Sequence, residues 1–333
     1  MTNLTVVGAT TWGTTLAIIS AREGSETKIL VRSQKEATYL NSQRENTRFL
    51  PGVKIPETAI ATESLDTAFD KSEVILFAVP SHSLRQNAKT VANKIDPEAI
   101  VVSAVKGLEV GSGKRMSEIL AEELPNTDKR NICALSGPNL AMEIVKGKPS
   151  STVIASSNIE VCTKAQKLLN SKQLRIYTND DIIGVEIGGA LKNITAIAVG
   201  ISDGLQFGDN AKAAIITRGL AEIARLGESL GAKKSTFSGL AGMGDLIATC
   251  SSSLSRNNQV GRMLATGQSI QDIHKTMKNV AEGVKTTEAA ISISRATGIS
   301  MPIASSVYDV LFNGIEPTHA VSSLMERAPT SEN

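Results

Sequence analysis

The sequence contains few cysteines, and their positions argue against two common uses of this residue. Only three occur among 333 residues, Cys133, Cys162 and Cys250, and no two of them lie close together in the chain. No histidine stands at a metal-ligand spacing from them, so neither a disulfide framework nor a metal site is expected. Reduced thiols in the cytoplasm are the simplest interpretation.

Strong charge and long apolar runs are also lacking. The formal net charge is only +2, which argues against a polyanionic partner such as nucleic acid and means that any phosphate binding is local. We expect no apolar run of membrane-spanning length, and the chain starts without a basic flank before an apolar core. The sequence therefore predicts a soluble, cytoplasmic protein without a membrane span, long enough for two domains.

The chain begins with a strand, a tight turn and a helix. Residues 4–7 are apolar, residues 8–13 contain two glycines, and a helical pattern follows over residues 14–19. In such a unit Gly8 makes the turn, Gly13 lets the helix pack closely on the strand, and the first amides of the helix face a pyrophosphate. The pattern predicts a dinucleotide-binding site.

The second predicted strand, residues 27–31, ends at Arg32 and Ser33. A site that selects NAD usually has a carboxylate at this point to bind the ribose hydroxyls, whereas this chain has a cation and a hydroxyl. A guanidinium can bind the 2′-phosphate of NADP, so we expect NADPH to be used at least as well as NADH. The alternative is a solvated arginine at the end of a strand.

Strands and helices continue to alternate through the first half of the chain. Residues 34–46 are expected to be helical and residues 49–52 to form a turn. Lys106 and Gly137 each follow directly after an apolar run, and ligands of open parallel sheets lie beyond the carboxyl ends of strands. The predicted fold class is α/β, with a Rossmann-like, doubly wound parallel sheet in a dinucleotide-binding domain of residues 1–184. Its later strands are expected over residues 74–80, 100–104, 132–135, 152–155 and 174–177.

Helical periodicity dominates the second half. Residues 270–277, 284–296 and 304–311 are amphipathic, and residues 211–230 carry one apolar stripe with Glu222 off it. The stripe consists of Ala214, Ile215, Leu220, Ile223, Leu226 and Leu230. We therefore expect an all-helical domain over residues 185–333, which holds the substrate and the catalytic residue.

A single cation interrupts an apolar, small-residue helical run over residues 185–200. This residue, Lys192, falls on the same face as Gly188 and Gly189, whose size lets another chain segment or a ligand come close. Such a lysine loses hydration, which is expected to lower its pKa and to suit it for proton transfer. The alternative is that its stem packs on apolar surface while its ammonium reaches water.

Two further stretches carry polar chemistry. Three glycines stand within residues 239–244, directly before Asp245, which could cap a helix, orient an ammonium or bind a substrate hydroxyl. Ser255 is placed to cap a second helix whose first residues are Arg256 and Asn257. Free amides, a positive helix end and a guanidinium suit a phosphate, although a plain capped surface helix is the alternative.

Together these residues resemble a known family. The segments GATTWGT, VPSH, KGL, SGPN, ALKNI, GLAGMGDL, SRN and AEG begin at residues 8, 79, 106, 136, 190, 239, 255 and 281. In this order, and over nearly the whole chain, they resemble the bacterial NAD(P)-dependent glycerol-3-phosphate dehydrogenases. Several ordered motifs are far more specific than any one alone.

The resemblance implies reversible hydride transfer between NAD(P)H and dihydroxyacetone phosphate, giving sn-glycerol 3-phosphate for phospholipid synthesis. It implies a homodimer, with Lys192 as the general acid/base on the C2 oxygen. The substrate residues it implies are Lys106, Gly137, Asn139, Lys192, Asp245, Ser255, Arg256 and Asn257. The cofactor residues, beside Gly8, Gly13 and Ser33, are Thr11, Trp12, Arg32, Lys106, Ala141, Arg256, Val280 and Glu282.

Two alternatives to this function stay open. One is a related lysine-dependent dehydrogenase acting on another phosphorylated or carboxylated hydroxy compound. The other is a nucleotide-binding regulatory protein without turnover, suggested by Thr10, where the family usually has glycine. A side chain there is expected to crowd the pyrophosphate, so we predict that Thr10→Gly tightens NADPH binding.

Overall fold

The structure is a computed structural model that describes residues 2–277 and 281–328. The chain falls into two compact units. The first, here called the sheet unit, comprises Met1–Lys106 and Lys114–Glu186. The second, the helical unit, comprises Gly107–Gly113 and Ile187–Asn333. The chain therefore passes from one unit to the other three times.

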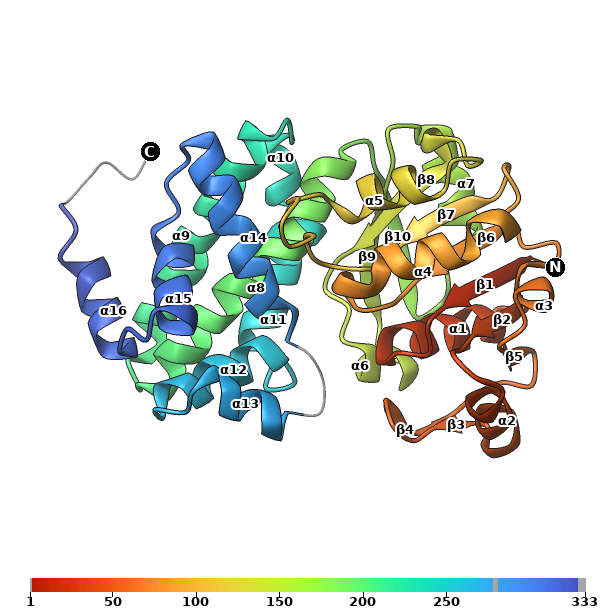
Figure 1. Ribbon diagram of the computed structural model, residues 1–333, viewed down its shortest axis with the longest axis horizontal. Coiled ribbons are helices and arrows are strands. Elements are labelled where there is room, and N and C mark those ends of the chain that lie inside the picture. Colours follow the sequence, from red (N-terminus) through yellow and green to blue (C-terminus); the bar gives the residue numbers. More distant parts are fainter. Residues whose placement is uncertain (1, 278–280, 329–333) are drawn as a thin grey trace. The chain divides into compact units, whose positions relative to one another are not determined.

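An eight-stranded sheet forms the centre of the sheet unit, in the order β10-β9-β8-β7-β6-β1-β2-β5 (Figure 1). The predicted α/β class with a mainly parallel sheet is confirmed, but β9 pairs antiparallel with β8, and β10 runs parallel to β9. The strands are β1 (Asn3–Val7), β2 (Glu26–Leu30), β5 (Ala59–Thr62), β6 (Val74–Phe77), β7 (Ile100–Ser103), β8 (Ile132–Ser136), β9 (Ser150–Ala155) and β10 (Leu174–Asn179).

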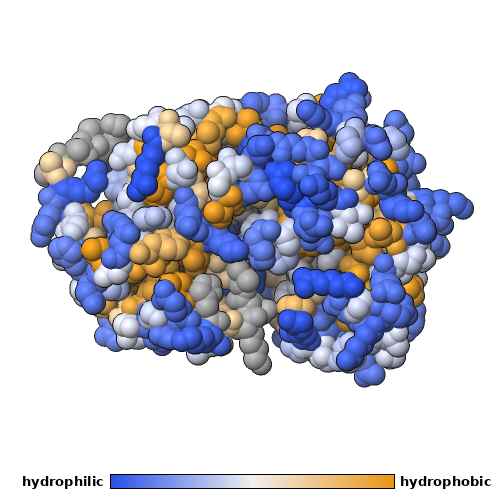
Figure 2. Space-filling model, in the orientation of Figure 1, coloured by the Kyte–Doolittle hydropathy of each residue, from blue (hydrophilic) through white to orange (hydrophobic). Residues whose placement is uncertain are grey.

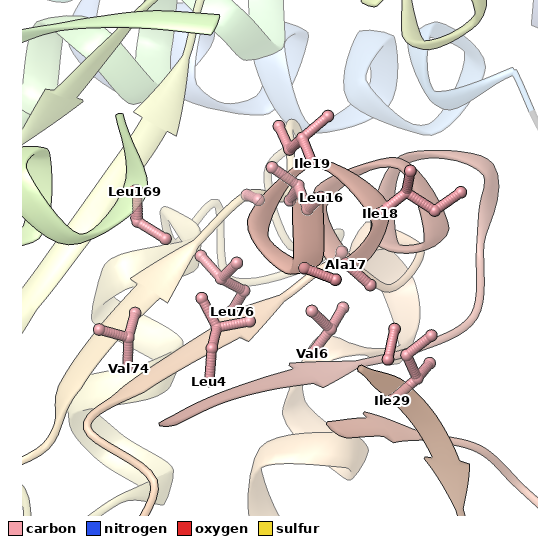
Figure 3. Close-up of a cluster of buried hydrophobic side chains, with 14 of the residues drawn as sticks. Leu4, Val6, Leu16, Ala17, Ile18, Ile19, Ile29, Val74, Leu76 and Leu169 are labelled. Atoms are coloured by element: carbon pink, nitrogen blue, oxygen red, sulfur yellow. The ribbon is translucent and has the colours of Figure 1, made fainter. Parts of the chain in front are cut away.

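The period-two alternation of the strands divides the core between the two faces of the sheet. Leu4 and Val6 of β1 belong to one buried cluster, together with Leu16 and Ile19 of helix α1, as Figure 3 shows. Val7 belongs to a second cluster, with residues of α3, α4 and α5. A doubly wound sheet results, because successive residues of each strand point to opposite faces.

Seven α-helices and three short 3₁₀ helices are described in the sheet unit. They are α1 (Thr11–Arg22), α2 (Gln34–Gln43), α3 (Leu65–Phe69), η1 (Ser81–Ser83), α4 (Leu84–Val91), η2 (Ala92–Lys94), α5 (Met116–Glu123), η3 (Lys129–Asn131), α6 (Ala141–Val145) and α7 (Ile159–Leu169). The helix predicted over residues 34–46 ends earlier, at Gln43. The turn predicted at residues 49–52 lies too late in the chain, because residues 47–49 form the turn between the antiparallel strands β3 (Glu45–Asn46) and β4 (Leu50–Lys54).

At the β10 edge of the sheet, the outward-facing backbone groups of Leu174 and Ile176 are already bonded by nearby residues. Ser171 accepts from the amide of Leu174 through its hydroxyl at 2.9 Å, and its own amide donates to the Leu174 carbonyl at 3.1 Å. The side chains of Asn170 and Gln166 bond the amide and the carbonyl of Ile176, at 3.0 and 2.7 Å. These four groups therefore have partners although, in the part of the chain that the structure describes, no strand pairs with the outer side of β10.

The helical unit is organised around α8 (Ile182–Gly204), whose first residues still belong to the sheet unit. By length and composition α8 could cross a membrane, contrary to the prediction that no apolar run is long enough. However, 83% of its most apolar window is buried inside the protein, as in a core helix. The other helices are α9 (Gly208–Ser229), α10 (Lys234–Phe237), η4 (Leu240–Gly244), α11 (Asp245–Ser251), α12 (Arg256–Ala265), α13 (Ile270–Thr276), α14 (Glu282–Thr297), α15 (Pro302–Phe312) and α16 (Pro317–Met325).

The apolar stripe predicted for α9 is correct in its C-terminal half and wrong at two positions. Ile223 and Leu226 are buried, but Ala214 is exposed and Glu222, placed off the stripe, is only 4% exposed. The Glu222 carboxylate accepts hydrogen bonds from the amides of Ile303, at 2.8 Å, and Ala304, at 3.2 Å. A charged residue is therefore buried because it binds the free amides at the start of α15, which periodicity along α9 does not reveal.

Glu222 makes part of the stability depend on pH. Burial raises its pKa from 4.5 to about 6, against the smaller opposing effect of the two amides. Because the pKa is raised in the folded state, its stabilising contribution is complete below pH 4.5 and is lost as the pH rises through about 6. Relative to Glu222→Gln, the wild type should lose about 2 kcal/mol of unfolding free energy between pH 4 and pH 7.

Urea unfolding of both proteins at several pH values measures this difference. The matched control is Glu228→Gln, an exposed position of the same helix. A stability difference between wild type and Glu222→Gln that stays constant over this pH range would contradict the assignment.

Candidate active site

Small residues of α8 admit two neighbouring segments to close approach around Lys192. A Cβ atom added to Gly188 would lie 2.9 Å from the carbonyl oxygen of Ala241, and one added to Gly200 would lie 2.1 Å from that of Asn258. Any side chain at these points would displace backbone. The face predicted to allow close contact is therefore filled by η4 and by the first residues of α12.

The ammonium of Lys192 lies inside the helical unit. The residue is 6% exposed, and its Nζ donates to Asp245 Oδ1 and to Thr249 Oγ1, both at 2.5 Å. The alternative in which this ammonium reaches water does not describe the structure. The ammonium and the Asp245 carboxylate therefore form a buried ion pair that fixes the position of Lys192 Nζ.

Asp245 orients this lysine and does not cap a helix. It is the first residue of α11, after a π-helical turn formed by η4, and Gly244 before it has no capping side chain. The predicted capping role is therefore wrong, whereas the predicted orientation of an ammonium is observed. Thr249 follows one turn later, and its Oγ1 lies 3.4 Å from Asp245 Oδ1. Thr249 was not among the predicted site residues, although its spacing of four residues from Asp245 on one helix would have identified it.

The predicted anion site at α12 has the geometry of a capped helix start. The Ser255 hydroxyl accepts from the Asn258 amide at 3.3 Å, which confirms Ser255 as the N-cap, and the first helical residue, Arg256, is exposed. The Asn257 side chain is fixed from both ends. Its Nδ2 donates to Asn193 Oδ1 at 2.9 Å, and its Oδ1 accepts from the Gly283 amide at 3.0 Å. These bonds leave the second Nδ2 proton for another acceptor.

Asn193 was not singled out in the sequence, although it follows Lys192 directly. Through Asn257 it links the lysine-bearing helix to the helix start that suits a phosphate. The helical unit thus brings together five of the predicted substrate residues around α8, α11 and α12, namely Lys192, Asp245, Ser255, Arg256 and Asn257. No local pattern distinguishes Asn193 from other polar residues of a helix, so its role depends on tertiary packing.

In the sheet unit, the remaining predicted substrate residues lie beyond the ends of β7 and β8. The Nζ atom of Lys106 donates to the carbonyl of Gly137 at 2.9 Å, and Asn139 Nδ2 donates to Thr152 Oγ1 at 2.8 Å. Two buried side-chain atoms of this loop, Ser136 Oγ and Asn139 Oδ1, have no partner within residues 2–277 and 281–328. Unsatisfied buried polar atoms are rare, and here they adjoin the predicted substrate residues.

The turn after β1 has the form that a dinucleotide requires. Gly8 has a φ of +106°, and a Cβ atom on Gly13 would lie 2.0 Å from the Gly8 carbonyl oxygen, so both glycines are needed for the tight turn. Thr11 and Trp12 begin α1, and amides at these positions have no acceptor within the helix. Free amides at a positive helix end fit the pyrophosphate of NAD(P).

The other predicted cofactor residues occupy separate places. Arg32 is exposed, and its guanidinium forms no ion pair within the part of the chain that the structure describes. Ser33 caps α2, accepting from the Glu36 amide at 3.3 Å. Ala141 begins α6 and Glu282 begins α14, whereas Val280 lies outside the described residues.

Among residues 2–277 and 281–328 there is no group of three or more histidine, cysteine, aspartate or glutamate side chains that could hold a metal ion. Cys250 packs in a cluster with Ala196 and Val199 of α8, and burial raises the pKa of its thiol to about 12. A thiol with this pKa stays protonated at neutral pH and is a poor nucleophile.

A mainly parallel sheet with a dinucleotide turn, next in sequence to a helical unit that buries a lysine–aspartate pair, defines a nicotinamide-dependent dehydrogenase. Comparison with known proteins makes this specific. The family described as NAD-dependent glycerol-3-phosphate dehydrogenase matches with its N-terminus over residues 3–162 and with its C-terminus over residues 181–322. The chain belongs to this family.

Individual relatives agree over the full length. A glycerol-3-phosphate dehydrogenase (NAD(P)+) of Dehalococcoides mccartyi is 48% identical, over 98% of this chain and 91% of the relative. One of Geobacillus thermodenitrificans is 44% identical, over 100% of this chain and 97% of the relative. The crystal structure of the glycerol-3-phosphate dehydrogenase of Coxiella burnetii superposes with a TM-score of 0.92 at 35% identity, covering 98% and 99% of the two chains.

Proposed function

We propose that Lys192 is the general acid/base in the reaction of this family, the NAD(P)H-dependent reduction of dihydroxyacetone phosphate to sn-glycerol 3-phosphate. The observation that carries the proposal is the buried contact of its ammonium with Asp245 and Thr249. When bound, the reduced nicotinamide supplies the hydride for the C2 carbon. Lys192 stabilises the negative charge that grows on the C2 oxygen and gives that oxygen a proton, and in the reverse direction it accepts the proton.

In this proposal the phosphate of the substrate binds the protein away from the reacting C2 carbon. Arg256 and Asn257, at the capped start of α12, offer a guanidinium and an amide donor to an anion, and Ser255 fixes the helix start that carries them. Lys106, Gly137 and Asn139, in the sheet unit, are also proposed as substrate residues. Binding energy from the phosphate then holds C2 in a reactive position, which raises the rate of the chemical step.

The two alternatives considered from the sequence are not favoured. The full-length relatives described above are named for glycerol-3-phosphate dehydrogenase, and Lys192 has buried partners. We propose that residues 1–184 bind the dinucleotide and that residues 185–333 hold the substrate and the catalytic residue.

Oxidation of NADPH and NADH, followed at 340 nm with dihydroxyacetone phosphate, tests the reaction itself. We expect turnover with both cofactors and formation of sn-glycerol 3-phosphate. Dihydroxyacetone serves as the control substrate because it has the same ketone and lacks the phosphate. Equal kcat/KM for the two ketones would contradict the role of the phosphate. If neither ketone supports NADPH oxidation, the proposed function is wrong.

Arg32 is proposed to bind the 2′-phosphate of NADPH. Arg32 follows β2 and is exposed, and its guanidinium forms no ion pair within the described residues, although its backbone amide donates to Glu36 Oε2 at 3.2 Å. Arg32→Ala should therefore raise KM for NADPH about tenfold and leave KM for NADH within about twofold. The matched control is Arg48→Ala, whose guanidinium stacks on Phe49 at 4.8 Å from the ring centroid. Equal loss with both cofactors would remove Arg32 from the 2′-phosphate site.

We also propose that the protein is a cytoplasmic homodimer. Figure 2 shows hydrophobic residues at the surface of the helical unit around α15, and Phe312, Ile315 and Met325 are 38%, 37% and 81% exposed. Apolar surface of this kind is commonly covered by a partner subunit. Light scattering after size exclusion should give twice the monomer mass of 35.1 kDa, and a monomer mass at micromolar concentration would contradict the dimer. Recovery in the membrane fraction of lysed cells would contradict the location.

A further inference from the structure

Thr10 connects the dinucleotide turn to the neighbouring strand through one hydroxyl group. It is the N-cap of α1, and its Oγ1 accepts from the Gly13 amide at 3.1 Å. The same oxygen donates to the carbonyl of Ala78, directly after β6, at 2.6 Å. Its backbone is extended, with φ −74° and ψ 175°, so a residue with a side chain fits here without strain.

The hydroxyl has no proton left for a ligand. A threonine side chain carries one O–H, and that proton is used on Ala78. Its second lone pair stays free, which suits a donor and not an acceptor. Pyrophosphate oxygens accept hydrogen bonds only and carry negative charge, so they gain nothing from this hydroxyl and meet a lone pair instead.

A residue without the hydroxyl would change this chemistry. The Gly13 amide and the Ala78 carbonyl would then lose the partner that they share, and a water molecule lying beyond the remaining Cβ could bond both of them. A water in this place would accept from Gly13, donate to Ala78 and keep a second proton. That proton could be donated to a pyrophosphate oxygen at the start of α1.

We propose that Thr10 sets the affinity for the cofactor: its hydroxyl takes the place of a bridging water and thereby removes one hydrogen-bond donor from the pyrophosphate site. The inference rests on the assignment of a nicotinamide dinucleotide to this turn. It differs from the expectation that the side chain acts by crowding, because it depends on the hydroxyl that Ala78 and Gly13 hold. In this proposal the Thr10 hydroxyl lowers the affinity for the cofactor and orders the turn before the cofactor binds.

Binding measurements on Thr10→Ala and Thr10→Ser separate the hydroxyl from the bulk of the side chain. Thr10→Ala should bind NADPH about tenfold more tightly by fluorescence titration, which corresponds to one added charge-assisted hydrogen bond. Thr10→Ser keeps the hydroxyl and should stay within about twofold of the wild type. Adenosine 2′,5′-bisphosphate, which lacks the pyrophosphate, should bind all three proteins equally.

Several results would overturn the proposal. If Thr10→Ala binds NADPH no more tightly than Thr10→Ser, the hydroxyl does not set affinity. If Thr10→Gly alone binds more tightly, the methyl and Cβ groups act by crowding instead. A parallel change in bisphosphate affinity would indicate altered folding of the turn, and melting temperatures of all variants control for this. Because binding is measured without substrate, a protein that binds NADPH but does not reduce dihydroxyacetone phosphate contradicts the proposed function and leaves this inference intact.

Discussion

Replacing Lys192 by alanine is expected to lower kcat for dihydroxyacetone phosphate by about 10³ to 10⁴. The substitution removes both the proton donor and the cation that faces the growing negative charge on the C2 oxygen, and each effect contributes on the order of a hundredfold or more. The dissociation constant of NADPH should change by less than about threefold, because the dinucleotide turn belongs to the sheet unit. Single-turnover and binding measurements separate the two effects.

The same substitution leaves Asp245 buried without its cation. Removing one partner of a buried ion pair commonly costs about 3 to 5 kcal/mol of stability, so activity must be measured where circular dichroism shows a folded protein. Lys192→Ala combined with Asp245→Asn should recover part of that stability and none of the turnover. Lys212→Ala is the matched control, because it removes a lysine whose Nζ lies 2.7 Å from Asp203 Oδ1. A kcat within tenfold of the wild type in Lys192→Ala would refute the assigned role.

Replacing Arg256 by alanine should lower kcat/KM for dihydroxyacetone phosphate by about a hundredfold. The guanidinium of Arg256, at the start of α12, offers charge-assisted hydrogen bonds to the phosphate, and the loss of such contacts amounts to about 2 to 3 kcal/mol. With dihydroxyacetone, which has no phosphate, the variant and the wild type should differ by less than about threefold. The effect therefore depends on the substrate and is not a general loss of activity.

Arg262 provides the control for this second substitution. It lies on the same helix, and its guanidinium binds Asp203 at 2.8 Å and has no assigned role in the reaction. Arg262→Ala should leave kcat/KM for both ketones within about threefold. If Arg256→Ala impairs the two ketones equally, Arg256 acts on the cofactor or on the fold, and the anion site at α12 is wrong.

The parts of the fold that repeat local patterns were predictable. Apolar runs located β1, β6, β7 and β8 because strands buried on both faces are apolar throughout. The reversed direction of β9 and β10 was not predictable, because strand direction depends on connections across the sheet and not on composition. The short strands β3 and β4 were missed because their five or fewer residues carry too little alternation.

In the candidate site, too, residues with a local sequence signal were predicted and residues defined by tertiary contacts were not. Lys192 was found because a cation among small apolar residues is locally conspicuous, and the structure adds its partner Asp245. Asn193 and Glu222 were missed or misplaced because their roles depend on the Asn257 amide and on the free amides at the start of α15, elements distant in sequence. Sequence periodicity does not identify residues whose partners are determined by tertiary packing.

The bonded outer edge of β10 has a consequence beyond the reaction. A strand at the margin of a sheet normally offers unpaired amides and carbonyls on which a second chain can build intermolecular β-structure. In this protein Ser171, Asn170 and Gln166 already bind those groups at Leu174 and Ile176. A neighbouring molecule would have to break these local bonds before it could add a strand, so this margin is protected against aggregation at high protein concentration.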